Sequence, residues 1–68
     1  MTHILAARAA GDRYWHPQFT NDEADIVAEE LRVSAGDYPP GTMFVIVSAM
    51  DVGSAIAVLN TAQHMVPA

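Results

Sequence analysis

The 68-residue sequence predicts a small α+β domain in which strand, strand, helix, strand and helix follow one another. Three observations lead to this prediction: a helix-start signal at residues 20–23, a run of mainly apolar and β-branched residues at 42–49, and apolar residues at helical spacing after residue 51. If the third strand lies beside the first after a right-handed crossover, the sheet is three-stranded and antiparallel, in the order 2-1-3, with both helices on one face. The other sheet face would then be uncovered.

The first two elements are predicted to form a hairpin. Residues 3–10 and 13–19 fit two short extended segments, and Gly11 with Asp12 fits the tight turn between them. The alanine-rich residues 6–10 also fit the start of a helix, because alanine is the strongest helix former.

The first helix is expected to begin directly after Thr20. Thr20 and Glu23 fit a capping box, in which each side chain accepts the other residue's backbone N–H. Carboxylates in the first turn favour the same start, because they stabilise the positive end of the helix dipole. We expect this helix to run from Asn21 to about Ala35 and to end at Gly36 in a left-handed cap.

The second half of the chain predicts a loop, a strand and a helix. Two prolines and a glycine in residues 37–41 indicate a rigid loop. Residues 42–49 consist mainly of apolar and β-branched side chains, which predicts a strand buried on both faces or nearly so. A helix over about residues 51–65 follows, with Ser48 or Asp51 as its cap.

Composition limits the classes of function. Residues 1–68 form a single domain at most, because a chain of this length has room for only one small core. The net charge of −5, with no lysine, disfavours direct binding to nucleic acid. Without cysteine, neither a disulfide framework nor thiolate chemistry is available. No signal sequence or membrane span is recognisable, so we expect a cytoplasmic protein that does not bind membranes.

No pattern in the sequence predicts a catalytic centre, a metal site or a bound cofactor. His3, His16 and His64 lack the spacing that would place two metal ligands on one face. The serines lie at the ends of elements, where capping explains them, and the acidic residues of the first helix lack an apolar pocket that would raise a pKa. We therefore expect a protein that is not an enzyme.

The first helix carries the stronger candidate for a partner-binding surface. A helical projection places its core stripe at Ala24, Val27, Ala28 and Leu31. Ile26 and Val33 fall on nearly the opposite side, among acidic residues, as in helices that dock into a groove. The competing interpretation is that the second helix or another chain covers them. The predicted binding residues of this face are Asp22, Ile26, Glu29, Glu30 and Val33.

The uncovered sheet face is the second candidate. In an extended segment Trp15 and Phe19 face the core, while Tyr14, His16 and Gln18 face the other side. Tyr14 and His16 combine contact area with hydrogen-bonding groups, so they are predicted as further partner-binding residues.

The outer face of the second helix has no charged residue, which indicates self-association. Gly53 and Ala57 form a pair of small residues that allows another backbone to approach closely. Ordinary neutral surface is the competing interpretation. The predicted contact residues are Gly53, Ala57, Asn60 and His64.

Two hypotheses of function follow. The first is a small acidic protein-binding module, for which a homodimer is also expected, such as an inhibitor or modulator of a larger nucleic-acid-handling protein. The alternative is a homodimeric small-ligand binder or enzyme whose site lies in the cleft between subunits. The predicted lining of that cleft is Arg13, Tyr14, His16 and His64.

Overall fold

The computed structural model describes residues 1–64, with side chains described as far as Thr61. The strands form one antiparallel sheet in the order β2-β1-β3, so the predicted fold class, strand order and pairing are confirmed. The elements in chain order are β1 (Thr2–Arg8), β2 (His16–Asn21), α1 (Ala24–Ser34), the short 3-10 helix η1 (Ala35–Asp37), β3 (Met43–Ala49) and α2 (Val52–His64).

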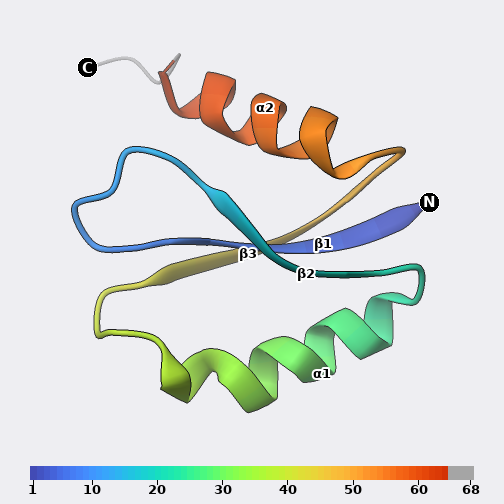
Figure 1. Cartoon of the computed structure of the whole chain (residues 1–68), viewed down its shortest axis with the longest axis horizontal. Helices are drawn as coiled ribbons and strands as arrows, with labels where there is room; N and C mark the ends of the chain where they lie inside the picture. Colours follow the sequence, from blue (N-terminus) through green and yellow to red (C-terminus); the bar gives the residue numbers. More distant parts are fainter. Residues whose placement is uncertain (65–68) are drawn as a thin grey trace.

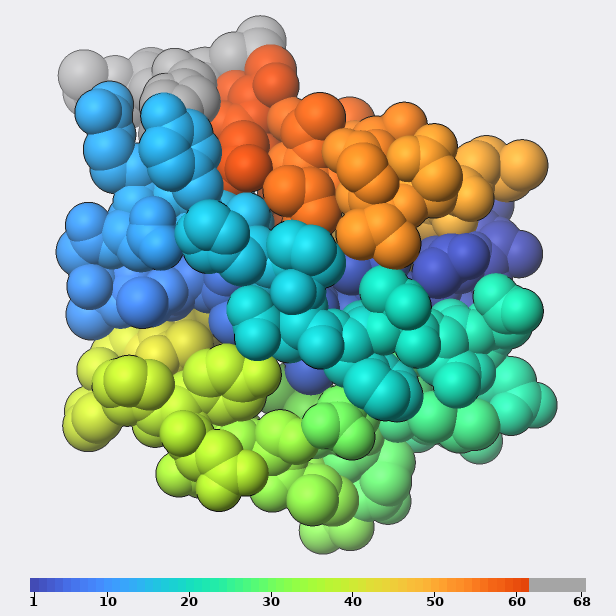
Figure 2. Space-filling view, in the orientation of Figure 1, coloured from blue at the N-terminus to red at the C-terminus, as the bar shows by residue number. Residues whose placement is uncertain are grey.

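The two helices lie on opposite sides of the sheet, so the molecule has three layers (Figure 1). In the space-filling view the β2 edge of the sheet crosses the molecule between α2 above and α1 below (Figure 2). The structure corrects the expected placement of both helices on one face. Both parities of the central strand are apolar, and Ile4, Leu5, Ala6 and Ala7 are all at most 5% exposed. Only a helix on each side removes all four from water.

The connection between β1 and β2 is longer than the sequence predicted. β1 continues to Arg8, which excludes a helix start at residues 6–10, and β2 does not begin until His16. Gly11 has a φ of 83°, a left-handed conformation that favours glycine. The hairpin therefore carries a loop at its tip in place of a tight two-residue turn.

Trp15 joins this hairpin to α2. Its backbone N–H donates to Oδ1 of Asn60 at 2.7 Å, and the Arg8 guanidinium lies 5.5 Å from the centre of its ring, a cation-π arrangement. Trp15 and Phe19, the predicted core anchors, are only half-buried. The core is instead aliphatic, and its largest fully buried side chains are Ile4, Leu5 and Val27.

Both ends of α1 differ from the prediction. Thr20 pairs with Ile4 inside β2, so the predicted capping box does not form. Glu23 is the N-cap residue without a side-chain cap bond, and Asn21 instead accepts the backbone N–H of Glu23 at 2.9 Å. At the other end the helix continues into η1, and Gly36 does not adopt the predicted left-handed conformation. Strand pairing of Thr20 replaces the local cap.

The loop before β3 is confirmed, but the burial of β3 is not. Gly41 has a φ of 89°, and the carbonyl of Pro39 accepts both the backbone N–H and the hydroxyl of Thr42. β3 is an edge strand, and Met43 and Ile46 are exposed on it. α1 packs on β1 and β2, which leaves part of β3 without cover.

Asp51, one of the two residues predicted as the cap of α2, forms that cap. Its carboxylate accepts the backbone N–H of Ser54 at 2.8 Å and the Ser54 hydroxyl at 2.9 Å. These bonds, the backbone bond first, hold the pKa of Asp51 below its ordinary value of 3.8. The charged carboxylate is therefore favoured by folding.

Because the folded-state pKa of Asp51 is lowered, the cap stabilises the protein above the ordinary pKa, and this contribution is lost as the pH falls through the folded value. We expect Asp51→Asn to keep the cap but to remove this part of the acid sensitivity, whereas Asp51→Ala lowers the Tm at neutral pH as well. Thermal unfolding from neutral to strongly acidic pH checks both. Identical curves of Tm against pH for wild type and Asp51→Asn would contradict the assignment.

The bond between Trp15 and Asn60 gives a second prediction. Asn60→Ala leaves a partly buried backbone N–H without its acceptor, and we expect a loss of about 1–2 kcal/mol in the free energy of unfolding. Asn60→Asp keeps an acceptor at the same position and should lose less. Urea unfolding of the three proteins measures the difference. Equal stability of wild type and Asn60→Ala would show that the hairpin does not depend on this bond.

Candidate functional site

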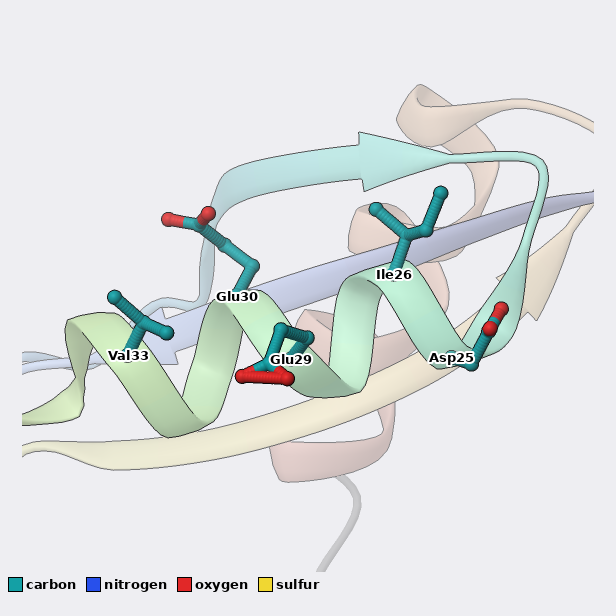
Figure 3. A pocket seen from close by; sticks show the side chains of 5 residues that line it. All are labelled: Asp25, Ile26, Glu29, Glu30 and Val33. Atoms are coloured by element: carbon teal, nitrogen blue, oxygen red, sulfur yellow. The ribbon is translucent and has the colours of Figure 1, made fainter.

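A groove with a volume of about 470 Å³ runs along the outer side of α1. Figure 3 shows that Ile26, Glu30 and Val33 point to the same side of the helix, with Asp25 and Glu29 beside them. We call these five residues the α1 groove. It contains four of the five residues predicted for this face.

The fifth predicted residue, Asp22, does not line the groove, because it precedes the first turn of α1. Asp25 lines the groove, although the prediction did not include it. Its spacing of four residues from Glu29 was the available signal, since side chains at i and i+4 of a helix are neighbours.

Two branched apolar side chains are exposed in the α1 groove. Ile26 is 38% exposed and Val33 is 63% exposed, whereas Val27 on the inner side is fully buried. The predicted core stripe is narrower than expected, because Ala24 and Ala28 are exposed. The second helix does not cover the groove, since α2 lies on the other side of the sheet (Figure 1).

The α1 groove lies at the acidic pole of the molecule. Residues 22–33 contain five carboxylates and one arginine, a net charge of −5 + 1 = −4, out of −5 for the whole chain. Arg32 pairs with Glu29, and the Ser34 hydroxyl donates to Glu30. Both members of the ion pair are largely exposed, so the pair contributes little to stability.

Tyr14 and His16 do not form the predicted surface on a bare sheet face. α1 packs on β2 from one face of the sheet and α2 from the other, and Tyr14 lies in the loop before β2. The β-bulge opposite Leu5 and Ala6 also leaves Gln18 without a partner in the register, which breaks the alternation that the prediction assumed. Tyr14 and His16 are exposed at the hairpin and do not line the α1 groove, whose residues all belong to α1.

Asp12 organises the hairpin loop around Tyr14 and His16. Its carboxylate accepts the backbone N–H of Tyr14 at 3.0 Å and lies 3.1 Å from Nε2 of His16. The backbone bond is the larger cause that lowers the pKa of Asp12, and the bond to His16 adds to it. The polar side chains of Asp12 and His16 are therefore engaged in bonds within the loop itself.

The histidines are separated by the fold. Nδ1 of His3 lies 2.7 Å from the Ser48 hydroxyl across the sheet, far from the pair formed by His16 and Asp12. The side chain of His64 falls outside the described residues. In the part of the chain that the structure describes, no three His, Cys, Asp or Glu side chains are grouped to hold a metal ion, and no helix is long and apolar enough to cross a membrane.

Of the residues predicted for self-association, some lie on the outer surface of α2 and one does not. Gly53 and Ala57 are exposed on α2, as expected. Asn60 does not belong to that outer surface, because its side chain is turned toward the hairpin and accepts the Trp15 N–H. Val58, which the prediction did not include, is the most exposed large apolar residue of the described part of α2, at 66%.

Comparison of the chain with protein-family models, curated protein sequences and solved structures returned no match. The geometry of the chain therefore provides the argument for function.

The exposure of the α1 groove predicts that its apolar residues are dispensable for folding. We expect Ile26→Asp with Val33→Asp to lower the free energy of unfolding by about 1–2 kcal/mol, because Ile26 loses its partial burial and two carboxylates are added to an already acidic helix. Val27→Asp, one residue from Ile26 but fully buried, should prevent folding. Circular dichroism and urea unfolding compare the variants. If the double variant unfolds as Val27→Asp does, the groove residues belong to the core.

Proposed function

We propose that the protein is a small acidic module without catalytic activity that binds another protein through the α1 groove. The observation that supports this proposal is the exposure of two branched apolar side chains, Ile26 and Val33, among the carboxylates of one helix face. Isolated exposed apolar residues are ordinary, but a groove that combines them with three carboxylates, in a segment that carries −4 of the chain's net −5, is suited to recognition.

The chemistry of the groove defines the partner. Ile26 and Val33 are seven residues apart, so they lie about 10 Å apart along the helix axis at ~1.5 Å per residue. A matching surface has two apolar depressions at that spacing, surrounded by Lys and Arg side chains that pair with Asp25, Glu29 and Glu30. The apolar anchors provide most of the binding energy, and the charges provide steering and orientation.

Surfaces of this kind occur where proteins hold nucleic acid. The charge that repels a phosphate backbone attracts the basic residues that bind it. We infer that the protein acts as an inhibitor or modulator of a larger nucleic-acid-handling protein, by occupying part of its basic surface. The proposal includes a cytoplasmic location, with which a chain without cysteine is compatible.

A photo-crosslinking amino acid at position 33, with position 58 as the matched control, identifies the partner. The two valines are almost equally exposed, at 63% and 66%, but they lie on opposite helices of the molecule. We expect a protein that crosslinks from position 33 and not from position 58. This protein, once purified, is then used in the binding measurements.

Affinity for the purified partner should depend on apolar and charged groups separately. Ile26→Ser with Val33→Ser keeps the net charge and should raise the Kd at least about tenfold. Glu29→Gln with Glu30→Gln keeps the shape and should weaken the dependence of affinity on salt. Val58→Ser serves as the control for surface substitution.

A Kd that neither pair of substitutions changes would contradict the proposal, as would equal crosslinking from positions 33 and 58. Competition with a nucleic acid bound by the partner tests the narrower inference. If protein and nucleic acid bind the partner together without mutual effect, the α1 groove does not occupy a nucleic-acid site.

A further inference from the structure

β3 forms one edge of the sheet, and no strand within the described residues pairs with its outer side. It pairs with β1 in an unbroken register over seven residues, from Met43 opposite Arg8 to Ala49 opposite Thr2. The outer side of such a strand presents a row of backbone N–H and C=O groups that can receive another strand.

The features that normally protect an edge strand are missing from β3. Charged residues, prolines and bulges usually prevent edges from pairing with other chains. The opposite edge, β2, has Pro17 and the bulge at Gln18. Residues 42–50 contain neither a charged residue nor a proline, and the register of β3 has no irregularity. In addition, Met43, Ile46 and Met50 are exposed on or beside the strand.

β3 and the described part of α2 contain almost no charge of their own, and the nearby cation is Arg8 of β1, whose guanidinium lies 3.2 Å from Sδ of Met43 at one end of β3. From residue 42 to residue 61 only Asp51 is ionisable as an acid or base, while residues 22–33 carry a net −4. α2 contacts β3, contains no Asp, Glu, Lys or Arg, and exposes Val58. Two copies of an acidic chain meet with the least repulsion on this neutral side.

We propose that β3 pairs antiparallel with β3 of a second copy, so that two three-stranded sheets become one continuous sheet. Ile46 is the central residue of Met43–Ala49, and a two-fold axis at this position makes the pairing symmetric. Ile46 then lies opposite Ile46 of the partner subunit, and Val45 lies opposite Val47 of the partner subunit. Each copy offers an apolar, uncharged strand to the other.

The acidic helices do not oppose this pairing. A two-fold axis perpendicular to the sheet keeps α1 of both copies on the same face, each above its own β1 and β2. At ~4.8 Å per strand the two helices are about 19 Å apart, well beyond the screening length of about 8 Å at physiological salt. The uncharged α2 helices share the other face.

Single cysteines test the register, because the chain has no cysteine of its own. Residues opposite each other in antiparallel strands have Cα atoms about 4.5–5.5 Å apart, within the range of a disulfide. We expect Ile46→Cys to form a disulfide-linked dimer under mild oxidation. Ser48→Cys should not, because the two residues at that position are offset by four positions, about 13 Å along the strands.

Light scattering after size-exclusion chromatography measures the association itself. We expect the wild-type chain to have the mass of a dimer, and Ile46→Glu to have the mass of a monomer because two like charges meet at the axis. Ile26→Glu is the matched control: Ile26 is 38% exposed and Ile46 is 37% exposed, but Ile26 lies in the α1 groove. This control variant should stay dimeric, so the dimer and the partner-binding proposal are tested separately.

A wild-type chain that stays monomeric at high concentration overturns the proposal. So does a dimer that crosslinks from position 48 as readily as from position 46, or one that Ile26→Glu dissociates. If Ile46→Glu does not fold, the cysteine pair still decides the register in a nearly native background.

Discussion

The burial of β1 on both of its faces is the constraint on which the rest of the structure depends. Ile4 to Ala7 are four consecutive residues with almost no exposed surface, and alternate residues of a strand point to opposite faces. Each face therefore needs its own cover, and the chain has only two helices to provide it. With α1 on one side and α2 on the other, neither helix is available to cover the outer side of its companion (Figure 1).

This division leaves two separate surfaces. α1 buries Val27 against the sheet and turns Ile26, Val33 and its carboxylates outward, which creates the α1 groove. On the other side, α2 and β3 form a neutral, partly apolar surface. The acidic face is suited to a basic partner and the neutral face to a second copy of the chain. The two proposed contacts are compatible in one short chain, because residues 22–33 carry −4 of its net −5 and β3 contains no charged residue.

The hairpin shows how long-range contacts replace local signals. Thr20 carries a clear capping pattern, yet it pairs with Ile4 in the sheet, where several backbone bonds and side-chain contacts are gained together. Trp15, the largest side chain, does not fill the core. Its backbone N–H bonds to Asn60 of α2, and its ring lies beside Arg8 of β1. Trp15 therefore links the hairpin loop to two elements that are distant or separate from it in the sequence. A small aliphatic core leaves no space for an indole ring at its centre.

The sequence by itself predicted the element order and the antiparallel sheet order, limited the cap of α2 to Ser48 or Asp51, and placed Ile26 and Val33 opposite the core stripe of α1, because these depend on local periodicity and on the number of residues between elements. Only the tertiary structure decided that the helices lie on opposite faces, that Tyr14 and His16 have no bare sheet face to occupy, and that Asn60 points inward. These features depend on which face of β1 each helix covers. Residues 4–7 are apolar at both parities, so the strand itself is compatible with cover on both faces, but it does not specify which helix covers which face.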